Sequence, residues 1–408
     1  MKHLSTKVST TDAVPSFGGV VKQPTRVRSR ARVSRVLWLQ AHLYLGLFVG
    51  ALLVVFGLTS SILVFWQELD EWFNPDLLMV TVPPGTEPGE RGYRPLTDIL
   101  AAAQQAGLRG SEVTQVYAPS SLERVAAVYL QHPSKAWQRV FVDPYRATVT
   151  GVRTYGAGKL VPDGFIDIVF QLHYALFLGE TGMAVAAVCA LLLILTLVTG
   201  LIVWWPLTKQ WRQAFAIRRP VTPTRLLFDL HKTFSLYPCL VLGAVLLSGV
   251  YMNMADPFVW VTQLFSPETR GLSPVAVVRP IPEAKSIDPE QAVTIAATRY
   301  PEGRLNSISV PADAEGVYQI GRLDVPGLSQ FWSERIVSID QYSGEILDVR
   351  APDTRRSAGE AFLDWQWPLH SGKAFGWPGR LLVFVSGLAC PIIYASGVLM
   401  WWRKRRTR

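Results

Sequence analysis

Residues 172–206 read LHYALFLGETGMAVAAVCALLLILTLVTGLIVWWP, and this stretch decides the class of fold. It contains most of a charge-free run of 28 residues that extends from Thr181 to Thr208. About 20 apolar residues span a bilayer as a helix. Three further charge-free runs, of 22 to 32 residues, lie at Val36–Gln67, Thr233–Ala255 and Leu381–Trp402. The sequence therefore predicts an integral membrane protein with four transmembrane helices.

The composition points the same way. Of the 408 residues, 49% are hydrophobic and 17% are charged, whereas a soluble chain carries about 25% charged residues. The apolar content excludes disorder over most of the length. Its concentration in four runs excludes a single soluble domain.

The net charge of +9 is concentrated in three segments. Residues 1–35 carry +7, residues 206–225 carry +5 and residues 403–408 carry +5. In a four-helix topology these segments lie on one side, and the positive-inside rule places them in the cytoplasm. We predict a bacterial inner-membrane protein with both termini in the cytoplasm and residues 68–164 and 257–368 in the periplasm. Topology and lipid contact explain the basic segments, so no nucleic-acid partner is predicted.

The chain contains an internal repeat. When His173 is placed over His370, matching residues recur without a gap: Asp143 and Asp340, Arg153 and Arg350, Gly182 and Gly379, Gly200 and Gly397, Trp204-Trp205 and Trp401-Trp402. His42 and His231 also match, each near the cytoplasmic start of an outward-going helix. We predict two halves in the same orientation, related by a pseudo-two-fold axis along the membrane normal.

Each periplasmic segment has the pattern of a helix followed by strands. The predicted helices cover residues 96–106 and 289–299, and the predicted strands cover 125–130, 139–142, 316–320 and 335–339. One helix packed on a small antiparallel sheet fits each segment, which predicts two α+β domains. Domains of about 70–90 residues bury only a small core, so we expect them to pack on the membrane helices or on each other.

The predicted fold class is a membrane α-helical bundle of four transmembrane helices in two pseudo-symmetric halves, with two periplasmic α+β domains. Along the chain we predict a disordered basic cytoplasmic tail (1–34), transmembrane helix one (35–67), the first periplasmic domain (68–164), a periplasmic-entrance helix with transmembrane helix two (165–206), a basic cytoplasmic loop (207–225), transmembrane helix three (226–256), the second periplasmic domain (257–368), a periplasmic-entrance segment with transmembrane helix four (369–402) and a cytoplasmic tail (403–408).

Four of the six histidines lie in the membrane or at helix ends. His42 and His231 are predicted at similar depth near the cytoplasmic face, and His173 and His370 at the periplasmic ends of helices two and four. Each pair takes one residue from each half. Two facing imidazoles inside a helix bundle are typical of a haem with two axial histidines. We predict two bis-histidine haems, of b type because the chain has no C-x-x-C-H motif.

Haem propionates bind cations. Lys232 with Arg35 or Arg225 is the candidate at the inner haem, and Arg380 with Lys373 at the outer one. Zinc or non-haem iron is a weaker interpretation, because these metals favour Asp, Glu or Cys beside histidine. A proton relay through the histidines is a further alternative.

The stretches Leu172–Glu180 and Gly200–Pro206 resemble the PepSY-associated transmembrane proteins, and Arg139–Pro144 and Ile339–Glu345 resemble the end of a PepSY domain. The resemblance covers roughly residues 34–402. This family is described as iron-regulated inner-membrane proteins and includes ferric-siderophore reductases that bind b-type haem through membrane histidines. The resemblance implies that the four paired histidines are haem ligands and that both periplasmic domains are PepSY-like. Ala147 stands where the family has a turn glycine.

The histidine pairs and the resemblance together predict an oxidoreductase that reduces a ferric siderophore in the periplasm and releases Fe(II). The chain has no G-x-G-x-x-G unit or P-loop, so membrane quinol or a cytoplasmic reductase is the expected electron donor. No catalytic residue is predicted beyond the haem ligands. The alternatives are a PepSY-bearing membrane sensor or protease-regulating module without redox activity, a transporter of a metal or chelate, and a haem electron carrier to another periplasmic acceptor.

Overall fold

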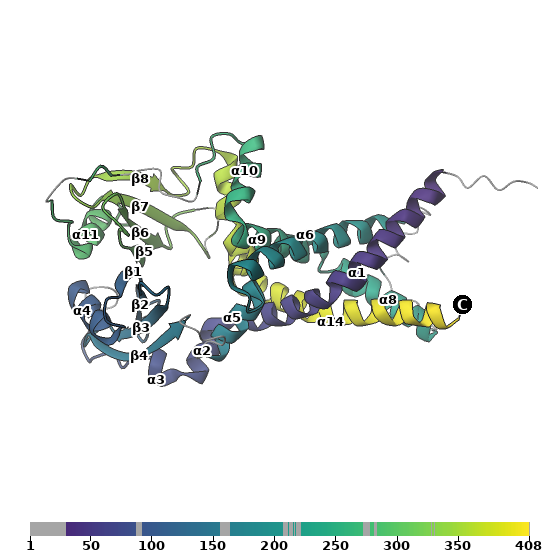
Figure 1. Cartoon of the computed structure of the whole chain (residues 1–408), viewed down its shortest axis with the longest axis horizontal. Helices are drawn as coiled ribbons and strands as arrows, with labels where there is room; N and C mark the ends of the chain where they lie inside the picture. The colour runs from purple at the N-terminus through teal and green to yellow at the C-terminus, as the bar shows by residue number, and fades with distance from the viewer. Residues whose placement is uncertain are drawn as a thin grey trace, which may run out of the picture.

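The computed structural model describes residues 30–86, 92–155, 164–206, 222–271, 278–280, 284–327 and 331–407, with residues 211, 215, 217 and 329. The predicted tail over 1–34 and the predicted loop over 207–225 lie largely outside these residues. The described chain has a region of long helices at one end and a sheet region at the other (Figure 1).

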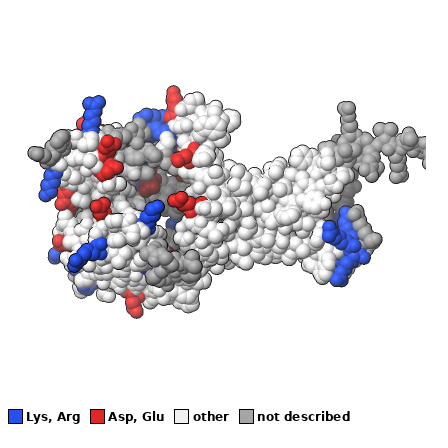
Figure 2. Space-filling view, in the orientation of Figure 1, with Lys and Arg blue, Asp and Glu red and all other residues white. Residues whose placement is uncertain are grey.

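Long apolar helices form the first of these regions. Among the described residues, three helices are long and apolar enough to cross a membrane: α1 (Arg30–Leu63), α6 (Gly179–Trp204) and α14 (Gly376–Arg406). A fourth candidate consists of α8 (Pro223–Leu236) and α9 (Cys239–Asn253) taken together. Figure 2 shows that the visible face of these helices is nearly free of charge up to the basic end of α14.

The third predicted transmembrane helix is not continuous. We predicted one helix over residues 226–256, but the chain bends by 58° between α8 and α9. Pro238 lies at the bend, and a proline lacks the backbone N–H and crowds the carbonyl four residues earlier, which ends a helix. Because of the bend, α8 packs on α14 while α9 packs mainly on α6.

The remaining elements make the sheet region and connect it to the long helices. The described strands are β1 (Glu112–Tyr117), β2 (Ala126–Gln131), β3 (Trp137–Asp143), β4 (Thr148–Tyr155), β5 (Arg304–Ser309), β6 (Val317–Leu323), β7 (Glu334–Asp340) and β8 (Ile346–Arg350). The helices are α2 (Trp66–Phe73), α3 (Pro75–Leu78), α4 (Leu96–Ala106), α5 (Phe165–Ala175), α10 (Ala255–Phe265), α11 (Pro289–Arg299), α12 (Ala358–Asp364), α13 (Gln366–His370) and the 3-10 helix η2 (Lys373–Phe375).

The strands form one antiparallel sheet in the order β4-β3-β2-β1-β5-β6-β7-β8. We predicted a separate small sheet in each segment, and this is wrong because β1 pairs with β5, from Gln115–Ser309 to Tyr117–Ser307. Unpaired, β1 and β5 would each be an edge strand with free N–H and C=O groups. Their pairing removes both edges and joins two small sheets over one core.

The core lies on the face of the sheet that is turned away from the long helices. Val128, Val140, Ile320 and Val337 on this face have no exposed area. Helices α4 and α11 cover it (Figure 1). Both helices have the bounds that the sequence predicts. The opposite face of the sheet is turned toward the long helices (Figure 1).

The turn at Ala147 has an unfavourable backbone conformation, because an alanine stands where the family has a glycine. Ala147 follows the turn begun by Asp143 and adopts a φ of 52°, and Gly344 has a φ of 72° in the turn begun by Asp340. A residue with a Cβ is disfavoured in this left-handed region by about 1–2 kcal/mol. The first turn therefore keeps the conformation at some cost in stability.

Two sets of ion pairs attach the sheet to the connecting helices, one buried and one partly buried. Arg153 of β4 donates to Asp70 of α2 at 2.7 Å and 2.8 Å and to Asp167 of α5 at 3.0 Å, and all three residues are buried. In the same way Arg350 of β8 donates to Asp364 of α12 at 2.9 Å. Asp167 follows Arg153 by 14 residues, and Asp364 follows Arg350 by the same number.

A further buried pair predicts sensitivity to acid. Arg270 donates to the fully buried Glu360 at 2.6 Å and 2.9 Å. Burial would raise the pKa of Glu360, but the hydrogen bonds from Arg270 and the Arg356 N–H outweigh it and lower the pKa to about 2. An unfolded glutamate titrates near pH ~4.3. The pair therefore stabilises the fold above that pH, and this contribution, on the order of 3 kcal/mol, is lost as the pH falls toward 2.

Thermal unfolding of the purified protein between pH 7 and pH 3 measures this effect. The midpoint of the wild type should fall with the pH. Glu360→Gln should have a lower midpoint at pH 7 and a smaller drop in acid. A variant whose pH profile matches that of the wild type would contradict the assignment.

Candidate functional site

The structure brings the predicted histidines together in two pairs. His42 of α1 and His231 of α8 have ring centroids 6.1 Å apart and ring planes at 79°. His173 of α5 and His370 of α13 have centroids 6.0 Å apart and planes at 65°. Each pair thus joins a histidine of the first half of the chain to one of the second half.

We call His42 and His231 the inner histidines, and His173 and His370 the outer histidines. One nitrogen of each inner histidine is hydrogen-bonded to a neighbouring helix. Nδ1 of His42 lies 3.0 Å from the carbonyl oxygen of Thr196, and Nδ1 of His231 lies 2.8 Å from that of Ile393. A carbonyl oxygen only accepts, so Nδ1–H is the donor in both rings. Nε2 then carries the lone pair.

The outer histidines are held in the same manner. Nδ1 of His370 lies 3.0 Å from the Val245 carbonyl oxygen, which makes it a donor. Nδ1 of His173 lies 2.8 Å from the Thr59 hydroxyl, whose own hydrogen goes to the Val55 carbonyl at 2.7 Å. The hydroxyl therefore accepts from His173. Metal-binding histidines commonly donate through the other ring nitrogen, which fixes the tautomer and the orientation.

The spacing within each pair fits a metal held between the rings. A metal–imidazole bond is about 2.0–2.1 Å long, and the ring centre lies about 1.1 Å beyond the nitrogen. Two imidazoles on opposite sides of one metal therefore have centroids about 6.3 Å apart. The observed separations of 6.1 Å and 6.0 Å agree with this value.

The donor set favours haem over other metals. In the part of the chain that the structure describes, no group of three or more His, Cys, Asp or Glu side chains is placed to hold a metal ion. Zinc takes at least three protein ligands, and the pairs offer two. A haem needs only two axial ligands because the porphyrin supplies the rest. The residues present therefore fit haem.

The two pairs lie far apart along the membrane helices. His42 and Thr59, which contacts His173, are both in α1, and 17 residues separate them. At 1.5 Å per residue this is about 25 Å. The separation approaches the hydrocarbon thickness of about 30 Å, so the pairs lie toward opposite faces of the helical region.

The predicted propionate-binding cations have other contacts. Arg35 donates to the Val203 carbonyl at 2.9 Å, at the end of α6. Lys232, next to His231, bonds the buried Asp229 at 3.1 Å. Arg380 bonds the Val64 carbonyl at 2.7 Å and Glu68 at 2.6 Å. These contacts anchor helices to one another, and a role at a propionate stays a prediction for all three cations.

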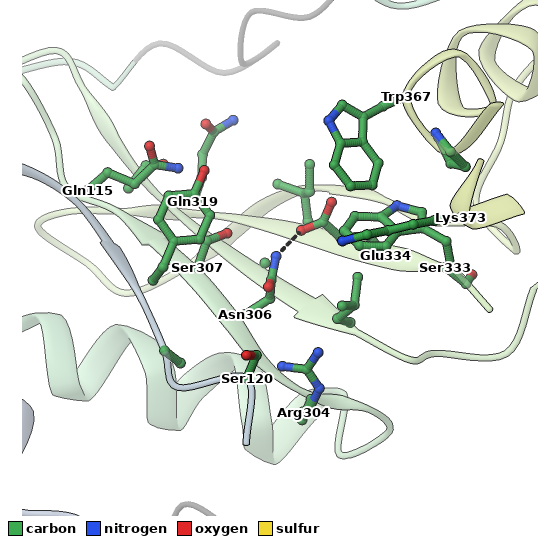
Figure 3. A pocket seen from close by; sticks show the side chains of 18 of the residues that line it. Gln115, Ser120, Arg304, Asn306, Ser307, Gln319, Ser333, Glu334, Trp367 and Lys373 are labelled. Carbon is green, nitrogen blue, oxygen red and sulfur yellow. Dashed lines mark hydrogen bonds between the residues drawn. The ribbon is translucent and has the colours of Figure 1, made fainter. Parts of the chain in front are cut away.

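A cavity of about 860 Å³ lies between the free face of the sheet and the connecting helices. Its helical wall includes Phe170 of α5 and Trp367 of α13, each three residues before an outer histidine. The sheet wall is largely polar (Figure 3), with side chains from both halves of the chain, among them Gln115, Asn306, Ser307, Gln319 and Glu334. The cavity therefore lies beside the outer pair.

Charges and aromatic rings in the cavity wall are arranged around this space. The Lys373 ammonium lies 5.2 Å and 5.1 Å from the ring centres of Trp332 and Trp367, within reach of cation–π attraction. Burial, with the nearby groups Tyr129 and Glu334, raises the pKa of Tyr117 to about 12. Tyr117 thus stays a neutral hydroxyl at physiological pH.

Sequence reasoning missed the cavity. A signal was present, because alternate residues on the strands are polar on one face, as in Ser307 and Ser309 of β5 or Glu334 and Ser338 of β7. That pattern identifies a face without a packed core. The pattern does not predict that this face of the sheet is turned toward the helices that carry the histidines.

Fold and site define a class of protein: a membrane protein whose helices carry two pairs of histidines, with a cavity between one of the pairs and a β-sheet. The chain belongs to the family described as the PepSY-associated TM region, which matches residues 39–404. The family predicted from the resemblance is therefore confirmed.

The chain is also similar to the uncharacterized protein PA4219 of Pseudomonas aeruginosa strain PAO1. The two are 26% identical over 265 residues, which cover 59% of this chain and 64% of that protein. The similarity thus spans less than two thirds of the relative's length.

Proposed function

We propose that this protein is a b-type dihaem electron-transfer protein of the bacterial inner membrane that reduces a ferric siderophore in the periplasm and releases Fe(II). The two histidine pairs carry the proposal, with ring centroids 6.1 Å and 6.0 Å apart and every Nδ1 held by a hydrogen bond. A bound haem supplies one-electron chemistry at its iron. If both histidines of a pair held the haem iron, the ligand set would favour electron transfer over oxygen binding.

The proposal includes the orientation and symmetry of the chain. The basic ends of the helices face the cytoplasm, and the sheet region forms the PepSY-like part in the periplasm. The two halves are related by a pseudo-two-fold axis. Corresponding contacts support this, since His42 bonds to Thr196 as His231 bonds to Ile393, with acceptors 197 residues apart.

The chain's own residues perform three tasks in this function. Helices α1, α8, α5 and α13 position the four histidines that would hold the haem iron. The carbonyl and hydroxyl acceptors on α1, α6, α9 and α14 keep each Nε2 available for iron. The cavity beside the outer pair binds the ferric chelate, and its volume of about 860 Å³ is within the range of small-molecule sites. Electrons enter from quinol or a cytoplasmic reductase.

The primary test is a reduced-minus-oxidised visible spectrum with pyridine haemochrome quantitation on protein purified in detergent after haem-replete growth. We expect about two b haems per chain, and dithionite-reduced protein should be reoxidised by a ferric chelate. A colourless protein would contradict the proposal and favour a membrane sensor or binding module. A coloured protein that no ferric chelate reoxidises would redirect the function to another periplasmic acceptor.

Small residues beside the inner histidines provide an independent prediction. A Cβ on Gly200 would lie 2.9 Å from Cε1 of His42, which is too close for both to keep their positions. Gly200→Ala should therefore weaken haem binding at the inner site by about 10–100-fold, as losses of orienting groups do. Gly243→Ala is the matched control, because its Cβ would meet nothing closer than Leu197 at 3.6 Å. Haem content and midpoint potential measure the effect, and equal values in both variants would refute it.

A further inference from the structure

One carboxyl in the cavity has no place in the electron path described so far. Glu334 begins β7 and lines the cavity wall (Figure 3). Asn306 of β5 donates to its Oε1 at 3.0 Å. A Cβ on Gly321 of β6 would lie only 2.9 Å from this Oε1. The glycine therefore leaves space for the carboxyl above β6. The carboxyl is therefore held in one place by its surroundings.

The second oxygen of Glu334 is free on the cavity side. Within the described residues, Glu334 forms no ion pair, and Oε2 has no hydrogen-bond partner. The side chain is half-buried and lines the cavity. A hydrogen on Oε2 would thus be offered to whatever occupies the cavity.

The pKa of the Glu334 carboxyl is raised above its ordinary value. Burial raises the pKa of this carboxyl; the hydrogen bond from Asn306 opposes the rise, and the negative charge of Asp364 adds to it. Tyr117 of β1, Arg304 of β5 and Lys373 of η2 also line the cavity. So does Asp364 of α12, which pairs at 2.9 Å with each of two further lining residues, Arg350 and Arg355. Arg304 is paired with Asp324 at 2.8 Å and Lys373 lies against two tryptophans.

Release of iron from an oxygen-donor chelate requires protons as well as electrons. Ligand oxygens lose protons when they bind a metal, so they must regain them when the metal leaves. A carboxylic acid that faces the bound chelate can supply one proton at the moment when a bond to iron breaks. Proton transfer by a positioned acid accelerates such steps by about 10²–10⁴-fold.

We infer that Glu334 is the proton donor for chelate release, an inference that rests on the proposed function. One electron from the membrane side converts Fe(III) to Fe(II), and one bond between iron and a ligand oxygen breaks. The Oε2 hydrogen of Glu334 passes to that oxygen. The resulting carboxylate takes a proton from water in the cavity and is ready for the next cycle.

The experiment compares two acceptors on full-length protein reduced with dithionite. Ferric tris(acetohydroxamate) takes an electron and a proton, whereas ferricyanide takes only an electron. Glu334→Gln should slow reoxidation by the hydroxamate about 100-fold at pH 7 and leave the ferricyanide rate unchanged. Lowering the pH should restore the hydroxamate rate. Glu334→Asp should lie between, and Glu315→Gln, in an exposed loop of the same region, should match the wild type with both acceptors.

A measurement without turnover tests the same assignment. As the pH is lowered, the infrared C=O band of a protonated carboxyl should grow in at a higher pH than for a free glutamate in the wild type and in Glu315→Gln, and this band should be absent in Glu334→Gln. An unchanged hydroxamate rate in Glu334→Gln, or an unchanged infrared band, would overturn the assignment. If the wild type is reoxidised by ferricyanide and not by the hydroxamate, the proposed acceptor class fails, and the infrared band still decides whether Glu334 holds a proton.

Discussion

His173→Ala and His370→Ala are each expected to remove one of about two haems per chain and to abolish reduction of a ferric chelate. Either change leaves one imidazole facing an empty position, because the two rings lie 6.0 Å apart and no third donor group is placed to hold a metal in the described chain. Pyridine haemochrome quantitation gives the haem content, and single-turnover reoxidation gives the rate. His42→Ala and His231→Ala should also lose one haem, from the inner site.

The controls separate ligation from folding. His132→Ala changes a loop histidine that bonds Ser134 at 2.7 Å, and it should keep both haems and the wild-type rate. His370→Gly leaves space for added imidazole, which should restore the second haem if the fold is intact. Full haem content in all four alanine variants would refute the assignment of the pairs.

Arg153→Met is expected to lower the free energy of unfolding of the sheet region by about 3–5 kcal/mol, the usual loss when one partner of a buried ion pair is removed. Arg153 is 4% exposed, and without it Asp70 and Asp167 remain buried with less compensation. Asp167 retains a bond from Arg139 at 3.1 Å, whereas among the described side chains Asp70 retains only the amide of Asn74 at 2.9 Å. The connection between β4 and α2 should therefore loosen first.

Pulse proteolysis in increasing urea measures this stability in the detergent-purified protein. Arg94→Met is the matched control, because Arg94 and Asp98 form an ion pair of 2.7 Å with side chains 56% and 39% exposed. Exposed pairs contribute about 0–1 kcal/mol. Equal urea midpoints for the two variants would show that the buried network does not hold the sheet to the helices.

Local patterns predicted the elements well where one short-range signal dominates. The helix at residues 289–299 has the predicted bounds because Asp288 and Gln291 form a capping box at its start. Charge-free runs located α1, α6 and α14 for a similar reason, since length and hydropathy alone decide whether a helix can span a bilayer.

Short-range signals did not predict the pairing of strands that lie far apart in the sequence. Strands β1 and β5 were not predicted, and both have a shift in register, between Val113 and Gln115 and between Leu305 and Ser307. A shift of this kind interrupts the alternation by which a strand is recognised. Their pairing joins residues nearly 200 positions apart, so neither the single sheet nor the cavity beneath it follows from local sequence.

The histidine pairs were predicted because a repeat relates them. Matching His173 to His370 placed both at one depth, and the structure brings the rings together. The cations were chosen by proximity in sequence, which does not give the direction of a side chain. Arg380 accordingly extends to Val64 and Glu68 of the first half.

The separation of about 25 Å between the two pairs along α1 has an electrical consequence for the proposed function. An electron that moves outward between them crosses most of the insulating layer, and it leaves the negatively charged interior of an energised cell. Moving one charge through the whole layer is worth about 2.3 kcal/mol per 100 mV of membrane potential. Iron reduction would therefore be electrogenic, and a respiring cell would drive it harder than a de-energised one with the same donor and acceptor.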